Sequence, residues 1–190
     1  MDETPIFFDS PFSSTIDKKG AKQIEIITSG AEKYRVSLLL TKSANGNRFP
    51  PLIIFKGVPG AKIEKELNKL QLVKDKKIFV LCQKNSWCTQ ELFIKWLKLV
   101  YRPYEFNQGK KCLLILDHTP SHDNNNSIEF MEKNGIENCF IPEGLTRLTQ
   151  PLDISINGPF KTYYKNCYTN YLLEKSNHLF YFEKPTKEDL

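Results

Sequence analysis

Three aspartates in this sequence, Asp2, Asp117 and Asp153, are placed where a carboxylate can do chemistry. Asp117 follows four aliphatic residues in a row, Leu113 to Leu116, and such a run predicts a fully buried strand. An acid at the carboxyl end of a buried strand lies where open α/β sheets hold their ligands. The alternative role for Asp117 is to cap the following loop, so its importance depends on the other two acids.

Carboxylates suit a hard divalent cation, because Mg²⁺ and Mn²⁺ bind oxygen ligands and leave coordination sites for substrate phosphates. Three acids that converge on one sheet edge would hold two such ions, which activate a water and stabilise the leaving oxygen of a phosphodiester. Asp153 stands at the expected start of a long helix, where the alternative is an acid stabilised by the helix dipole. His118 has two candidate partners, the metal and the following loop, and the loop is favoured.

Strands and helices must position these acids. The pattern predicts strands over 22–28, 78–81 and 139–141, and two strands around a turn at Asn45-Gly46. It predicts helices over 61–72, after an N-cap at Thr89, over 125–134 up to Gly135, and a long one with a kink or restart at Pro159. The expected apolar face of the second helix is Leu92, Phe93, Trp96, Leu97 and Val100, and that of the last is Ile156, Phe160, Tyr164, Cys167 and Tyr171. This order predicts one domain, residues 1–190, with a mixed sheet and helices packed on it.

The charge balance permits a polyanionic partner without requiring one. The net charge is +5, and lysine supplies nearly all of the positive charge, since only four residues are arginines: Arg35, Arg48, Arg102 and Arg147. Lysine acts as a point charge toward phosphates, whereas arginine reads base edges, so contact with a nucleic acid backbone is favoured over sequence recognition. The lysine-rich stretch over 62–77 is either such a contact or a solvated face, and the solvated face is favoured.

The cysteines and the hydropathy profile limit the class of protein. Five cysteines without a C-x-x-C pair predict buried free thiols in a reducing compartment and argue against a zinc site. No apolar run approaches the length of a membrane span, and no leader pattern opens the chain, so an intracellular protein without a membrane partner is expected. Trp87 and Trp96 are expected to pack in the core or at its edge.

Several motifs together resemble the catalytic domain of DDE-type transposases of the pogo, Tigger and jerky branch, within the mariner superfamily. Centromere protein B is a DNA-binding relative in that branch. The motifs are "MDET", "PPLIIFKG", "NSWCTQELFIKWL", "LLILDHTPSH" and "FIPEGLTRLTQPLDISINGPFK", which occur in the expected order and cover nearly the whole chain. The last two are fairly specific together, because each pairs an acid with a distinctive neighbourhood.

The resemblance implies an RNase H-like fold, a mixed five-stranded central sheet with helices on both faces. It implies that Asp2, Asp117 and Asp153 are the catalytic, metal-binding triad, with Mg²⁺ or Mn²⁺ as cofactor. The third acid of this branch is usually an aspartate, and Asp153, 36 positions after Asp117, lies where the branch places it. The implied activity is DNA strand cleavage and strand transfer in the nucleus, with a homodimer as the acting form.

The sequence departs from the family pattern at both ends. Only Met1 precedes the first acid, whereas relatives have several apolar strand residues there. At the other end, Thr186 caps an expected helix start, and the helix-turn-helix module with which relatives grip DNA is absent. The expectation is therefore a catalytic domain truncated at both ends. The alternative is a catalytically inactive relic that binds DNA or a protein.

Overall fold

The structure is a computed structural model that describes residues 1–9, 19–20, 31, 33–101 and 112–178. In chain order the described elements are β1 (Asp2–Phe7), β2 (Arg35–Leu40), β3 (Leu52–Lys56), α1 (Lys62–Leu67), α2 (Gln71–Lys74), β4 (Phe79–Gln83), α3 (Gln90–Trp96), the π-helical turn η1 (Leu97–Tyr101), β5 (Cys112–Asp117), α5 (Asn125–Lys133), β6 (Ile136–Ile141), α6 (Thr146–Thr149), α7 (Pro151–Ser155) and α8 (Asn157–His178). The strand predicted over 22–28 and the helix start predicted at Thr186 lie outside the described residues.

The described strands form two hydrogen-bonded sheets. One has the order β1-β2-β3-β4, antiparallel at its first two pairings and parallel between β3 and β4, and the other is the parallel pair β5-β6. The mixed α/β class is confirmed, but the single five-stranded sheet is not what the described residues show. Beside them, the Met1 terminal nitrogen, which precedes β1, donates a hydrogen bond to the Ile115 carbonyl of β5 at 3.0 Å.

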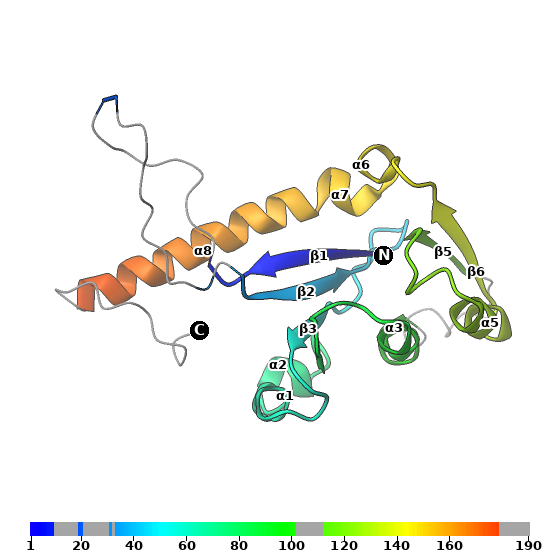
Figure 1. Cartoon of the computed structure of the whole chain (residues 1–190), viewed down its shortest axis with the longest axis horizontal. Helices are drawn as coiled ribbons and strands as arrows, with labels where there is room; N and C mark the ends of the chain where they lie inside the picture. Colours follow the sequence, from blue (N-terminus) through cyan, green and yellow to red (C-terminus); the bar gives the residue numbers. More distant parts are fainter. Residues whose placement is uncertain (10–18, 21–30, 32, 102–111, 179–190) are drawn as a thin grey trace.

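Helices cover the four-stranded sheet on both faces, as expected (Figure 1). On one face, Ile6, Val36 and Leu38 form a small core against which Phe160 and Tyr164 of α8 pack. The other face belongs to the main core, which α3, η1 and α5 complete. The largest fully buried side chains of that core are Trp96, Phe93, Leu39, Leu52, Ile54, Leu97, Leu116 and Met131.

Local sequence signals account for the ends of several elements. Thr89 caps α3 by accepting a hydrogen bond from the Leu92 nitrogen, as predicted. Gly46 has φ +92° in the turn between β2 and β3, a conformation that costs glycine little. Gly135 likewise follows the end of α5 with φ +68°. The predicted hairpin and both helix boundaries are therefore confirmed.

The helix predicted over 61–72 is two short helices, α1 and α2, which bury no residue. Leu70 between them has an extended ψ of 139°, which interrupts the helical path. Ile63, Leu70 and Leu72 are exposed, so the apolar spacing in this stretch does not mark a buried face. The exposed lysines agree with the solvated alternative for this stretch.

β5 is not buried on both faces, which corrects the expectation for the aliphatic run. Leu114 and Leu116 are buried, whereas Leu113 is 59% and Ile115 41% exposed. The strand thus alternates as a one-sided strand does, with one face in the main core. β6 also begins earlier than predicted, at Ile136, because the polar residues Glu137 and Asn138 interrupt the apolar pattern of the strand.

α7 and α8 realise the predicted long helix with a restart. The break falls at Ile156, and Pro159 lies in the first turn of α8, where its missing N–H is tolerated. Cys167 is exposed rather than part of the apolar face, and Cys139 is exposed as well, so only Cys82 and Cys88 fit the prediction of buried thiols. Within the described ranges, no helix combines the length with the apolar character that a membrane span requires.

Candidate metal centre

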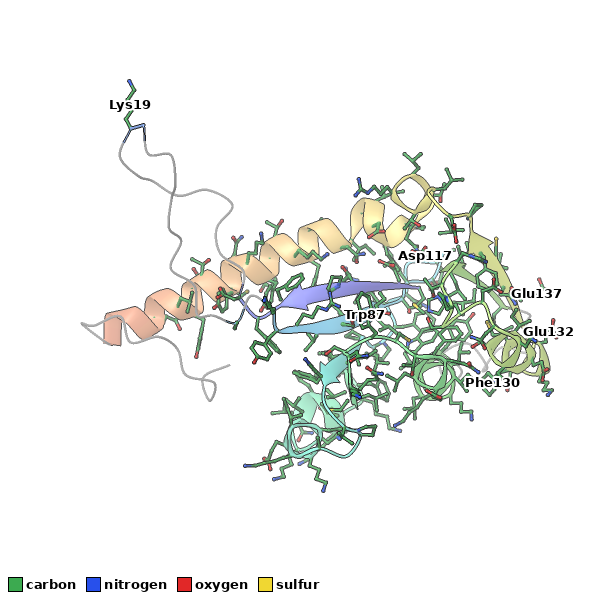
Figure 2. The ribbon with its side chains drawn as sticks, in the orientation of Figure 1. Lys19, Trp87, Asp117, Phe130, Glu132 and Glu137 are labelled. Carbon is green, nitrogen blue, oxygen red and sulfur yellow. The ribbon has the colours of Figure 1, made fainter. Side chains whose placement is uncertain are left out.

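The three predicted acids come from three different elements that meet at one end of the four-stranded sheet. Asp2 is the first residue of β1, Asp117 is the last of β5, and Asp153 lies in the first turn of α7. The hydrogen bond from Met1 to Ile115 sets the start of β1 beside the end of β5. Figure 2 shows Asp117 close to the N-terminal end of β1.

Two side-chain amides hold these carboxylates. The Asn157 Nδ2 donates to both Asp2 and Asp153, at 2.8 Å to the Asp153 Oδ1. The Gln150 Nε2 donates to the Asp117 Oδ1 at 2.8 Å and to the Met1 carbonyl at 3.2 Å. Both amide side chains are buried. Asn157 links the start of β1 to α7, and Gln150 links the end of β5 to Met1.

Sequence reasoning missed both amides as site residues. One signal was available for Asn157, because it follows Asp153 by four positions, which places two helical residues on the same face. Gln150 carried no comparable signal, since it stands between two short helices and its partners lie 33 and 149 positions away. Only the tertiary arrangement identifies it.

The three acids are close enough for their charges to interact. The pKa of Asp2 is raised to about 6, mainly by burial and also by the negative charges of Asp153 and Asp117, although the hydrogen bond from Asn157 acts in the opposite direction. Burial also raises the pKa of Asp117, and Asp153 acts in the same direction while Gln150 opposes it. Negative charge therefore accumulates here, and the positive charge that opposes it is the Met1 terminal ammonium, which lowers the pKa of Asp117.

The oxygen donors of Asp2, Asp117, Asp153 and Asn157 suit a hard cation, although the three carboxylates are not close enough together to coordinate one ion as they stand. In the described part of the chain, no group of three or more His, Cys, Asp or Glu side chains is close enough to hold a metal ion. The amide of Asn157 lies between Asp2 and Asp153, and its Oδ1 is buried without a hydrogen-bond partner among the described residues. Carboxylate and amide oxygens are the donors that Mg²⁺ and Mn²⁺ prefer.

Two histidines flank Asp117 in the loop after β5. His118 contacts the carboxylates of Asp123 and Glu143, so it engages its own loop and a neighbouring one, as favoured. His122 is buried, its Nδ1 lies 3.1 Å from the Asp117 carbonyl oxygen, and its ring packs against Phe93. His122 thereby fixes the backbone that presents the second acid.

His122 should make the fold acid-sensitive. Burial lowers the pKa of His122 from 6.5 to about 4, so the unfolded chain takes up a proton between those values while the folded chain does not. Stability is therefore lost as pH falls from about 6.5 to 4, by about 3 kcal/mol. The variant His122→Gln, which keeps a donor but cannot titrate, should lack this contribution.

Urea unfolding of both proteins at several pH values between 4 and 7.5 measures this prediction. The difference between wild type and His122→Gln isolates the histidine, because the opposite contribution of Asp2, whose raised pKa favours the folded state at acid pH, is common to both. Parallel pH profiles for the two proteins would contradict the assignment.

A protein-family model matches most of the chain. The model of the family described as DDE superfamily endonuclease matches residues 33–188, which include Asp117 and Asp153 but not Asp2. No solved structure matches the chain.

Curated relatives point to the same group. The proteins named "Pogo transposable element with KRAB domain" from Mus musculus and Homo sapiens are each 30% identical over 175 residues, which cover 90% of this chain and 27% of the relative. The "Jerky protein" of Mus musculus is 26% identical over 143 residues, 70% of this chain and 24% of the relative. The chain thus spans about a quarter of the length of these relatives. It belongs to the DDE superfamily endonuclease family, as a pogo-like domain.

Proposed function

We propose that this domain cleaves DNA strands at a divalent metal centre formed by Asp2, Asp117 and Asp153. The observation that carries the proposal is the bridging of Asp2 and Asp153 by one buried amide, that of Asn157, with Asp117 in the same electrostatic field. A structural role alone gives little reason to collect three acids at one place, where burial and also the charges of neighbouring acids raise the pKa of Asp2 and Asp117.

Each residue has a distinct task in this proposal. Asp117 is oriented by Gln150, and Asp2 and Asp153 are oriented together by Asn157, so the amides fix the directions in which the carboxylate oxygens point. Asp153 is exposed and Asp117 is partly exposed, which leaves them accessible to a phosphate from solvent. Bound Mg²⁺ or Mn²⁺ would supply the activation of water and the stabilisation of the leaving oxygen.

Further parts of the proposal follow from the family. Strand transfer, action as a homodimer, a nuclear location and an RNase H-like arrangement of the sheet are proposed on the likeness to pogo-type proteins. The substrate contact is proposed to be mainly with the phosphate backbone, because lysines supply most of the positive charge.

A plasmid-nicking assay tests the proposal. Supercoiled DNA incubated with the purified chain is expected to convert to the open circular form in Mg²⁺ or Mn²⁺ and to remain supercoiled in EDTA. A cooperative unfolding transition recorded on the same preparation establishes that the protein is folded. A folded protein that does not nick DNA in either metal would overturn the enzymatic function.

A further inference from the structure

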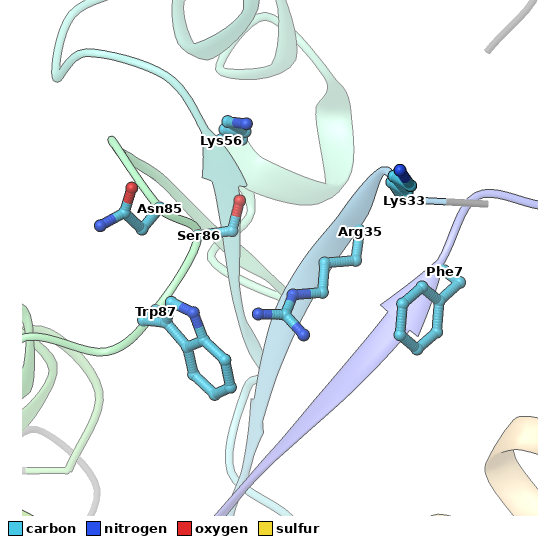
Figure 3. A pocket seen from close by; sticks show the side chains of 7 residues that line it. All are labelled: Phe7, Lys33, Arg35, Lys56, Asn85, Ser86 and Trp87. Atoms are coloured by element: carbon cyan, nitrogen blue, oxygen red, sulfur yellow. The ribbon is translucent and has the colours of Figure 1, made fainter. Parts of the chain in front are cut away.

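A pocket with a volume of about 470 Å³ lies at the end of the four-stranded sheet opposite to Asp2, and Figure 3 shows the side chains that line it. Its size is within the range of small-molecule sites. Its lining side chains are Phe7, Lys33, Arg35, Lys56, Asn85, Ser86 and Trp87. The set combines cations, hydrogen-bonding groups and aromatic rings, and none of its residues belongs to the candidate metal centre.

The sheet topology explains why these residues meet. Phe7 ends β1, Lys56 ends β3, and Ser86 follows the end of β4, so the carboxyl ends of three strands with the same direction border the pocket. Arg35 starts β2, which runs the other way. Ligands of α/β sheets bind outside the carboxyl ends of strands. Phe7 is five positions after Asp2, about 17 Å along the strand, so the two sites are separate.

The pocket concentrates positive charge that described acids do not neutralise. Lys33, Arg35 and Lys56 all line it, and none of them forms an ion pair with an acid in the described part of the chain. The Arg35 guanidinium lies over the Trp87 ring, 4.2 Å from its centroid, which orients the arginine and leaves its N–H groups available. Three neighbouring cations repel one another, so an anion here is stabilised by all three.

Ser86 gives an independent indication of a polar ligand. It is 1% exposed and lines the pocket, and its Oγ has no hydrogen-bond partner among the described residues. It also has φ +56°, a left-handed conformation that is uncommon for serine. A buried hydroxyl without a partner is unfavourable, and a phosphate oxygen in the pocket would accept its hydrogen bond.

We propose that this pocket binds the phosphate group of a nucleotide. Lys33, Arg35 and Lys56 supply the charge, and Ser86 donates a hydrogen bond. Phe7 and Trp87, 40% and 48% exposed, offer flat apolar surface to a base. This site goes beyond the proposed metal-dependent cleavage, because it needs neither the metal nor the three acids. A free nucleotide and a nucleotide within a DNA strand present the same phosphate and base.

The test measures binding of a dye-labelled single-stranded oligonucleotide by fluorescence anisotropy in EDTA, with the full chain. The double variant Lys33→Gln/Lys56→Gln is compared with Lys65→Gln/Lys74→Gln, which removes the same charge from exposed lysines on α1 and α2. We expect the pocket variant to bind at least about 10-fold more weakly and the magnitude of its salt slope to fall by up to about 1.4, whereas the control stays near wild type. Thermal melting of each variant establishes that it is folded.

Competitors distinguish the two sources of the phosphate. If a deoxynucleoside monophosphate displaces the oligonucleotide and the nucleoside without phosphate does not, the pocket accepts a free nucleotide. If only unlabelled oligonucleotide competes, the pocket takes a nucleotide within a strand. Equal weakening in the pocket and control variants, or equal competition by the nucleoside, would overturn the proposal. Asp117→Asn should bind like wild type, so loss of nicking and loss of this binding are separable.

Discussion

Asp117→Asn is expected to reduce metal-dependent nicking at least about 100-fold. The substitution keeps the size of the side chain and an oxygen that can accept from Gln150, but removes the negative charge. Mutation of a residue that hydrogen-bonds to a metal ligand lowers metal affinity or activity about 10–100-fold, so loss of a ligand itself should lower activity at least as much. The rate of plasmid nicking in saturating Mg²⁺ measures this effect.

A second readout that does not depend on activity separates metal binding from catalysis. Mg²⁺ should raise the melting temperature of the wild type, because a cation that binds only the folded state stabilises it, and it should not raise that of Asp117→Asn. Asp75→Asn, an exposed aspartate at the end of α2, is the matched control and should behave as wild type in both assays. An unchanged nicking rate in Asp117→Asn would remove this acid from the proposed centre.

Trp96→Ala is expected to lower the free energy of unfolding by about 3–5 kcal/mol, the range for large aromatic side chains removed from a core. Trp96 is fully buried, and its ring packs against Phe93 and Tyr101. Alanine would leave a cavity in the main core, to which α3 contributes its buried residues Leu92, Phe93 and Trp96. Urea unfolding followed by far-UV circular dichroism measures the loss.

Trp87 provides the matched control for the same substitution. It is 48% exposed and its main described contact is the stacked Arg35, so Trp87→Ala should cost about 1 kcal/mol or less. Similar losses for the two tryptophans would mean that the packing around α3 is looser than the structure shows. A change in the denaturant slope of either variant would indicate altered two-state behaviour instead.

Local signals in the sequence predicted the parts of the fold that depend on local chemistry. The cap at Thr89, the turn at Asn45-Gly46 and the stop at Gly135 each follow from one or two residues, and the structure has all three. The acids at element ends were found in the same way. The exposure of Leu113 and Ile115 was not predictable, because an aliphatic run does not reveal whether another element covers its second face.

Long-range contacts account for what the sequence did not reveal. Asn157 reaches Asp2 across 155 positions, and the nucleotide pocket assembles from the ends of separate strands. Periodicity describes neighbours along one element and carries no information about which elements meet. The family resemblance supplied the three acids as a set, but not the amides that orient them.

The division of the strands into two sheets means that the candidate metal centre lies between them. Asp2 is fixed to the four-stranded sheet and Asp117 to the β5-β6 pair, so the two carboxylates belong to separate hydrogen-bonded frames. The frames are joined by side-chain packing, the Met1 contact and the reach of Gln150. A cation bound by both acids would connect the two sheets, so part of its binding energy would stabilise the contact between them.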